Sequence, residues 1–292
     1  MTFAWVTMCV QWATWNIGIY RTCLESISSL LLTSASPQVP VIVLLDALGY
    51  ASMGSMLQKQ PGVLVKQLVH QNATALIRRN WSQVQSRQSQ RPTAVPREVT
   101  SLLKLQVFNL TQFSVVCWFD SDVLFLRNAS VLLTTAPPFA SIVLRRSEWG
   151  CKGRDYINDG VMLLRPSTAA YDTLYASFIS GDFFDCGGSE RMLGDQDVVR
   201  HHLFETKLLG PLHEWPICYN YRTWASQRHC VREDLFLIHV ASHHRERPKK
   251  IRLVSSGRNV SVADLPRILR FSRSGPLARH AKTKTKSRVS KL

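Results

Sequence analysis

The sequence lacks several features that would assign its class at once. Its seven cysteines form no CxxC pair, which excludes a zinc ribbon and a dithiol redox motif. No apolar run is long enough to cross a bilayer, and the apolar residues 1–10 lack the basic residue that begins a secretory signal. Glycine and proline, with 14 and 13 residues, are too few for a collagenous chain. We therefore expect a globular protein without a transmembrane segment, whose cysteines are free thiols in a reducing compartment.

Acidic residues are scarce, and the shortage is concentrated at one end of the chain. The 292 residues include 36 Lys and Arg but only 20 Asp and Glu. Residues 245–292 hold 15 of the basic residues and 2 of the acidic ones, so the rest of the chain is nearly neutral. A nucleic-acid-binding domain would carry a basic stripe on its folded part, and none is encoded. The pattern indicates a neutral body with a basic tail, predicted to be largely disordered over 250–292, and no nucleic-acid partner is expected.

Apolar runs alternate with segments of helical periodicity along the body. Strands are expected at 1–10, 39–45, 62–69, 113–119 and 160–164. Helices are expected at 18–32, 52–60, 102–109, 167–181 and from 195. A polar segment, 72–99, is predicted to be a long surface loop or flap. The alternation predicts one α/β domain with a mainly parallel central sheet, which we place at residues 1–249.

Two acidic residues, Asp120 and Asp122, directly follow the most apolar strand. Because residues i and i+2 of a strand point to the same side, their carboxylates can converge. Ligands of open parallel sheets bind beyond the carboxyl ends of the strands. Two converging carboxylates there favour a hard divalent cation such as Mg²⁺ or Mn²⁺. An ordinary Asx turn at the strand end is the alternative.

Five stretches, in order along the chain, resemble the motifs of glycosyltransferase family 8, the family of glycogenin and galactinol synthase. They are residues 4–8 with 15–18, 104–105 with 109–111, 119–123 with 126–128, 156–162, and 194–196. The ordered set extends over nearly the whole body. The resemblance implies a GT-A type, Rossmann-like nucleotide-diphospho-sugar transferase fold. It also implies a retaining glycosyltransferase that moves a hexosyl group from a UDP-sugar donor to a hydroxyl acceptor.

The resemblance further implies a Mn²⁺ or Mg²⁺ cofactor that bridges the donor diphosphate. Asp120 and Asp122 would hold it with His239 as the third ligand, and Arg245 or Arg247 would contact the diphosphate, which guanidinium groups grip in a planar fork. The chemistry agrees, because a diphosphate leaving group gains negative charge that a metal ion stabilises. Without the resemblance, His239 would be interpreted as a surface residue at a strand end.

Four catalytic roles are implied in the same way. Lys104 would lie near the donor phosphates or sugar, and Asn158 would bind sugar hydroxyls. Asp195 and Gln196 would flank the anomeric carbon. Without the resemblance, Lys104 would be interpreted as a solvated helical lysine, Asn158 as part of a turn and Asp195 as a helix N-cap. Because Gln is a poor nucleophile, front-face substitution is favoured over a covalent intermediate, with Asp197 as an alternative carboxylate.

The nucleotide contacts also follow from the resemblance. Thr7, Met8 and Trp15 fall where the family holds the uracil and ribose, and Trp15 offers a flat face to the base. Ser121, which lies between the two aspartates, would also contact the sugar-nucleotide donor. Asp159 stands where the family has a serine, which we expect to alter the sugar or acceptor preference.

Other classes of function stay open. A catalytically decayed relative would bind nucleotide sugars without turning them over. A nucleic-acid-binding protein acting through the tail would show salt-dependent binding that disappears on deletion of 250–292. A sugar-nucleotide pyrophosphorylase would need a glycine-rich loop after the first strand, and residues 9–16 contain no glycine.

Two signals for cellular location disagree. The chain ends in Ser290-Lys291-Leu292, a peroxisomal import tripeptide, so the peroxisome is the expected location and its import receptor an expected partner. The alternatives are the cytoplasm and the Golgi lumen. The lumen would suit five N-glycosylation sequons, at Asn72, Asn80, Asn109, Asn128 and Asn259.

Overall fold

The structure is a computed structural model. It describes residues 2–10, 18–34, 38–68, 102–134, 139–144, 155–180, 194–222, 236–239, 250–252 and 259–261. The predicted loop 72–99, the C-terminal tripeptide and the site residues Trp15 and Arg245 lie outside these ranges.

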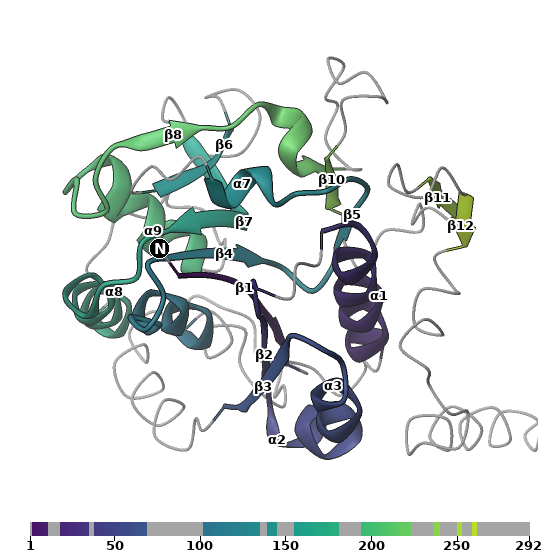
Figure 1. The fold of residues 1–292 in the computed structure, drawn as a ribbon. Coiled ribbons are helices and arrows are strands. Elements are labelled where there is room, and N and C mark those ends of the chain that lie inside the picture. The colour runs from purple at the N-terminus through teal and green to yellow at the C-terminus, as the bar shows by residue number, and fades with distance from the viewer. Residues whose placement is uncertain are drawn as a thin grey trace, which may run out of the picture.

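A seven-stranded sheet forms the centre of the molecule (Figure 1). Its order is β3 (Val63–Gln67), β2 (Val41–Leu45), β1 (Phe3–Cys9), β4 (Val115–Phe119), β7 (Tyr156–Leu164), β6 (Phe139–Leu144) and β8 (Leu212–Glu214). The first four strands are parallel to one another, β7 is antiparallel to both neighbours, and β8 is parallel to β6. The prediction of a mainly parallel α/β sheet is confirmed.

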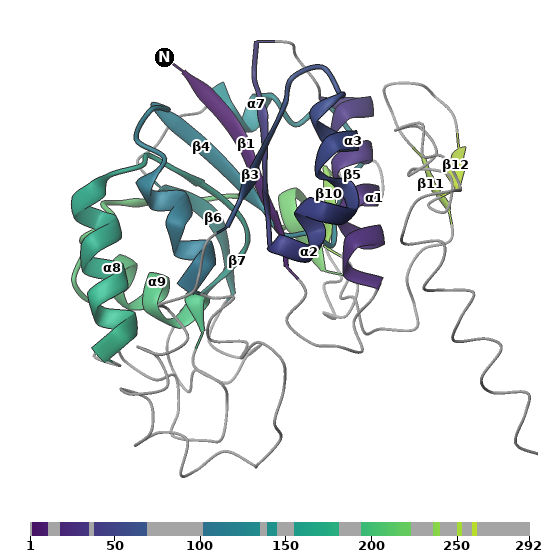
Figure 2. The ribbon, with the colours of Figure 1, turned by 90° about the horizontal axis from the view of Figure 1, so that it is seen from below.

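Helices cover both faces of this sheet (Figure 2). One face packs against α1 (Gly18–Thr33) and the short helix α3 (Ser55–Gln58). The other face packs against helical residues 102–104 with the 3-10 turn η2 (Leu105–Asn109), and against α8 (Thr168–Ser180) and α9 (Asp195–Phe204). Strands β1, β2 and β4 are buried on both faces because helices cover each, which explains their continuous apolar runs.

A second, three-stranded sheet stands at the end of β4. Its order is β5 (Val123–Phe125), β10 (Leu237–His239) and β9 (Tyr221–Arg222). Strand β10 runs antiparallel to β5, with His239 opposite Val123. The 3-10 turn η3 (Ile217–Asn220) leads into β9. This small sheet brings the C-terminal part of the body to the Asp120–Asp122 turn.

Several element boundaries differ from the sequence prediction. The strand expected at 160–164 begins at Tyr156, because Tyr156 to Asn158 pair with β6 and extend β7. Asn158 and Asp159 therefore lie inside a strand rather than in a turn before it. The helix expected at 52–60 begins earlier, with α2 (Ala47–Gly49), because the Asp46 side chain caps it, and continues through a π-helical turn (Tyr50–Gly54). The short helix α7 spans Val131–Thr134, where the sequence analysis predicts no element.

The cysteines also differ from expectation. Cys9 at the end of β1 and Cys23 in α1 form a disulfide, and Cys218 is disulfide-bonded as well. Cys117 is a buried free thiol in β4. The prediction that the cysteines are free thiols is therefore wrong for three of them.

Two further features bear on the predictions of a disordered tail and of a chain without a transmembrane segment. Strands β11 (Lys250–Arg252) and β12 (Asn259–Ser261) pair antiparallel within the segment predicted to be largely disordered, and the other residues after 249 lie outside the described ranges. Among the residues that the structure describes, no helix has the length and apolar character that crossing a membrane requires.

Candidate functional site

The Asp120-Ser121-Asp122 segment turns off the carboxyl end of β4, the central parallel strand of the large sheet. The Asp120 N–H donates to the Gly160 carbonyl of β7 (2.7 Å), and the Val123 N–H donates to the Asp120 carbonyl (3.1 Å). The indole Nε1 of Trp118 donates to Asp120 Oδ1 (2.9 Å). These bonds fix a tight turn that presents both carboxylates beyond the strand end, as the sequence predicts.

His239 meets these carboxylates through the small sheet. Its Nε2 lies 3.2 Å from Asp122 Oδ1 and 3.8 Å from Asp120 Oδ2, and the imidazole is buried. One ligand atom from each of the three residues lies within 4.8 Å of the other two. Two carboxylates and one imidazole nitrogen are a donor set that suits Mn²⁺. It suits Mg²⁺ less well, because Mg²⁺ prefers oxygen ligands. The structure thus brings His239 next to the two other residues predicted as metal ligands, Asp122 and Asp120, which lie 117 and 119 positions earlier in the sequence.

The packing around His239 requires a glycine on β7. A Cβ added to Gly160 would contact the His239 imidazole and would lie 2.9 Å from Asn158 Oδ1. Asn158 Oδ1 accepts hydrogen bonds from the Gly160 N–H (3.1 Å) and from Asn220 Nδ2 (2.7 Å). Asn158 is buried, so its amide is part of the support under the site. Asn220 was missed by the sequence reasoning, since no motif marks an asparagine at the end of a 3-10 turn.

Lys104 is the centre of a cluster of three carboxylates. Its Nζ lies 3.1 Å from Asp120 Oδ1, 3.0 Å from Asp159 Oδ2 and 2.8 Å from Asp195 Oδ2. The lysine side chain is only 7% exposed, so it is not the solvated helical lysine that its sequence context alone would favour. It also lies over the Trp118 ring, 5.3 Å from the centroid. One ammonium therefore joins a predicted metal ligand to a predicted catalytic residue.

Burial and charge act in opposite directions on this cluster. Burial alone would lower the pKa of Lys104, but the carboxylates of Asp120, Asp159 and Asp195 outweigh it and hold the pKa well above the usual value. Burial raises the pKa of Asp159 well above its usual range, the neighbouring Asp195 adds to the rise, and Lys104 opposes it. We infer that Lys104 stays charged and that Asp159 retains its proton to higher pH than an exposed aspartate does.

The Gly194-Asp195-Gln196 segment opens α9 beside this cluster. Gly194 is the N-cap, and its N–H donates to Asp197 Oδ2 (3.1 Å), so the capping carboxylate is Asp197 and not Asp195. Tyr156 also donates its hydroxyl to Asp197 (3.0 Å). Gln196 Oε1 accepts the Asp159 N–H at 3.4 Å. Asp197 is thus engaged in helix capping, while Asp195 faces Lys104.

The predicted nucleotide contacts receive less support from the geometry. Thr7 and Met8 lie on β1, but Thr7 is fully buried and Met8 packs in the core on the α8 face. Ser121 lies between the two aspartates and is half-buried. Trp15 and Arg245 lie outside the described residues. A role for these residues in binding the nucleotide stays a prediction.

No protein-family model matches the sequence, and no curated protein matches it. Solved structures do match the fold. Mouse xyloside xylosyltransferase 1 superposes with a TM-score of 0.55 at 14% identity, over 81% of this chain and 97% of that one. The galactosyltransferase LgtC, solved with donor and acceptor sugar analogues, gives 0.57 at 11% identity, over 96% and 99%. The glycosyltransferase GlyE of Streptococcus pneumoniae gives 0.52 at 13% identity, over 97% and 63%.

These likenesses establish the fold as the GT-A type that glycosyltransferases use. The fold prediction is confirmed. Membership of glycosyltransferase family 8 stays a prediction, because the structural neighbours share 11–14% identity with this chain and no family model matches.

Proposed function

We propose that the protein is a retaining glycosyltransferase that moves a hexosyl group from a UDP-sugar to a hydroxyl acceptor with the aid of Mn²⁺ or Mg²⁺. The observation that carries the proposal is the meeting of Asp120, Asp122 and His239 at the carboxyl end of β4, next to Lys104 and Asp195. The GT-A fold of the chain and of the transferases that resemble it supports the same reading.

Asp120, Asp122 and His239 would hold the cation, which supplies positive charge to the leaving diphosphate when bound. Lys104 is buried, and its ammonium group contacts Asp120, one of the proposed metal ligands, so it adds a fixed positive charge beside the metal site. Both features suit a bond cleavage in which negative charge grows on one side of the anomeric carbon.

Asp195 would bind the donor sugar, and Gln196 would lie on the face of the anomeric carbon opposite the leaving group. Asp195 is held by Lys104, and Gln196 by the Asp159 N–H, so both have fixed positions at the start of α9. An amide is a poor nucleophile, and Asp197, the alternative carboxylate, is engaged by Gly194 and Tyr156. Front-face substitution, with the acceptor attacking on the side that the diphosphate leaves, is the mechanism we propose.

Hydrolysis of UDP-sugars tests the proposal. We expect the full chain to release UDP slowly from UDP-glucose, UDP-galactose or UDP-N-acetylglucosamine, only with Mn²⁺ or Mg²⁺ present. Asp122→Asn should lower kcat by about 10²-fold or more, in line with the loss of one charged group in an active site, while Asp172→Asn on the exposed side of α8 should not change it.

Binding distinguishes the proposal from a catalytically decayed relative. If UDP binds in the presence of Mn²⁺ but no UDP-sugar turns over, the site only binds nucleotide sugars. If neither UDP binding nor turnover depends on the metal, the proposed site is wrong.

A further inference from the structure

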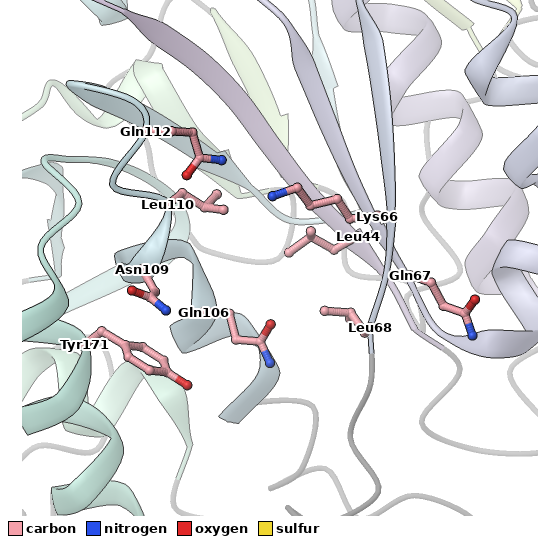
Figure 3. A pocket seen from close by; sticks show the side chains of 9 residues that line it. All are labelled: Leu44, Lys66, Gln67, Leu68, Gln106, Asn109, Leu110, Gln112 and Tyr171. Atoms are coloured by element: carbon pink, nitrogen blue, oxygen red, sulfur yellow. The ribbon is translucent and has the colours of Figure 1, made fainter.

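A cavity of about 390 Å³ lies apart from the Lys104 cluster, on the sheet face that α8 and η2 cover (Figure 3). Its described walls come from β2, β3, α8, and η2 with the residues that follow it. Among the residues that the structure describes, no helix covers the edge strand β3 on this face, and Leu64 of β3 is 51% exposed. The cavity therefore lies between these helical segments and the edge of the sheet.

The floor of the cavity is apolar. Leu44, Leu68 and Leu110 line it, and all three belong to the buried core on this face. Tyr171 of α8 adds an aromatic ring that is half-buried, and Figure 3 shows its hydroxyl directed away from the helix. A ligand that fits must offer carbon-bound hydrogens to this floor and ring.

The rim is polar and carries mostly amides. Gln106, Asn109 and Gln112 line it, and each primary amide can both donate and accept hydrogen bonds. Thr168 donates its hydroxyl to Asn109 Oδ1 (3.5 Å), which orients that amide from the α8 side. Lys66 is the one cation among the described lining residues, and none of these is acidic. The amide side chains suit a neutral molecule with many hydroxyl groups, because hydroxyls also both donate and accept hydrogen bonds.

We propose that this cavity binds a neutral saccharide unit. A pyranose ring has the apolar faces that the leucines and Tyr171 suit, and hydroxyls at its edge that the amides suit. Lys104 lies two residues before Gln106 on the same helical segment, so the bound saccharide would be near the transferase site without entering it. If the proposed function holds, this saccharide would be a unit of the acceptor that lies away from the hydroxyl that reacts. That further assignment rests on the proposed function.

Saccharide binding in the absence of donor and metal tests the proposal. Lactose, xylobiose, maltotriose and chitotriose would each be titrated into the full chain, with inorganic phosphate for comparison, and binding followed by saturation-transfer NMR and calorimetry. We expect at least one saccharide to bind, and Gln106→Ala and Tyr171→Ala each to raise its Kd at least tenfold. Gln58→Ala, an exposed glutamine of α3 on the opposite sheet face, serves as the control and should leave the Kd unchanged.

Three results would overturn the proposal: no binding of any of the four saccharides, binding that both cavity variants leave unchanged, or binding of phosphate alone. Asp122→Asn separates it from the proposed function, because that variant should lose UDP-sugar hydrolysis but keep the saccharide Kd. If saccharide binding depends on Gln106 and Tyr171 while no UDP-sugar is ever hydrolysed, the cavity proposal holds and the transferase proposal fails.

Discussion

Lys104 is the residue on which most of the site's electrostatics depends. It is surrounded by Asp120, Asp159 and Asp195, which reach it from the end of β4, the interior of β7 and the start of α9. Three carboxylates this close would repel one another strongly without a cation. The lysine therefore keeps the cluster assembled, and it does so next to the residues that would hold a metal ion.

Replacing Lys104 with methionine should show this role. The methionine keeps much of the apolar stem but leaves three acidic groups without their shared partner, so we expect a loss of about 3 kcal/mol in unfolding free energy. Urea denaturation measures it. The matched variant Lys66→Met, which removes an exposed lysine from β3, should change stability by less than about 0.5 kcal/mol. Equal effects of the two substitutions would contradict the account.

Asp159 should make stability depend on pH. Its pKa is raised in the folded state, so the folded protein binds this proton more tightly than the unfolded chain, whose aspartates titrate near 4. The resulting stabilisation is fully present below about pH 4 and is lost as pH rises toward the folded pKa, at no more than about 1.4 kcal/mol per pH unit. Asp159→Asn, which cannot lose a proton, should therefore gain in Tm relative to the wild type between pH 4 and pH 7, measured in EDTA. A constant difference in Tm over that range would show that Asp159 does not titrate as inferred.

At the scale of elements, the site depends on how β10 packs against β5 and β7. Strand β10 has three residues, and its register with β5 places His239 opposite Val123, next to Asp122. Gly160 of β7 leaves the room that the imidazole occupies. The metal ligands are thus held together by strand pairing and by one missing side chain.

Gly160→Ala tests this packing. The added methyl group would contact the imidazole and the Asn158 amide, so His239 must move. We expect Mn²⁺ affinity in the presence of UDP to fall at least tenfold, measured by calorimetry, with a circular dichroism spectrum like that of the wild type. Gly62→Ala provides the comparison: it lies at a turn with φ of 75° and open space around it, so it should lower stability while leaving Mn²⁺ affinity unchanged.

Asp46 supports a different element. Its carboxylate caps α2 through the Gly49 N–H (2.7 Å) and accepts the Tyr20 hydroxyl of α1 (2.8 Å), joining the two helices on one sheet face. Asp46→Ala should lower unfolding free energy by about 1–3 kcal/mol, since it removes a cap and leaves a buried hydroxyl unpaired. The effect on UDP-sugar hydrolysis should be small once the variant is folded, and a selective loss of activity would assign Asp46 to the site instead.

The elements also show what the sequence could reveal. Continuous apolar runs were sufficient to predict β1, β2 and β4 and the turn at Asp120, because these strands are buried on both faces. The start of β7 was missed because Asn158 and Asp159 are polar, and their burial is stabilised by Asn220, Gln196 and Lys104 from distant segments. The convergence of Asp159, Asp195 and Lys104 depends on tertiary packing that no local pattern encodes.

At the scale of the whole molecule, the three metal-site residues and the Lys104 cluster all lie between positions 104 and 239, while the excess positive charge lies in residues 245–292. Removing residues 262–292 should therefore leave metal-dependent UDP-sugar hydrolysis within about twofold of the full chain. Kinetics of the two proteins at equal concentration check this. A loss of activity on truncation would place part of the catalytic machinery in the tail.

The location of the protein in the cell bears on its acceptor. The peroxisomal expectation concerns residues 290–292, which lie outside the described residues, whereas the Cys9–Cys23 disulfide is typical of oxidising compartments and suits the luminal alternative. A fluorescent fusion at the N-terminus, compared with the same fusion lacking the last three residues, decides between them.

The most direct test of the account is the coordination of Mn²⁺ itself. Pulsed electron paramagnetic resonance of the full chain with Mn²⁺ and UDP detects nitrogen bound to the ion. We expect a nitrogen coupling in the wild type and its loss in His239→Gln, with His213→Gln, an exposed histidine of β8, behaving as the wild type. A Mn²⁺ complex without nitrogen coupling, or one whose coupling survives in His239→Gln, would contradict the claim that these two aspartates and this histidine form one metal site.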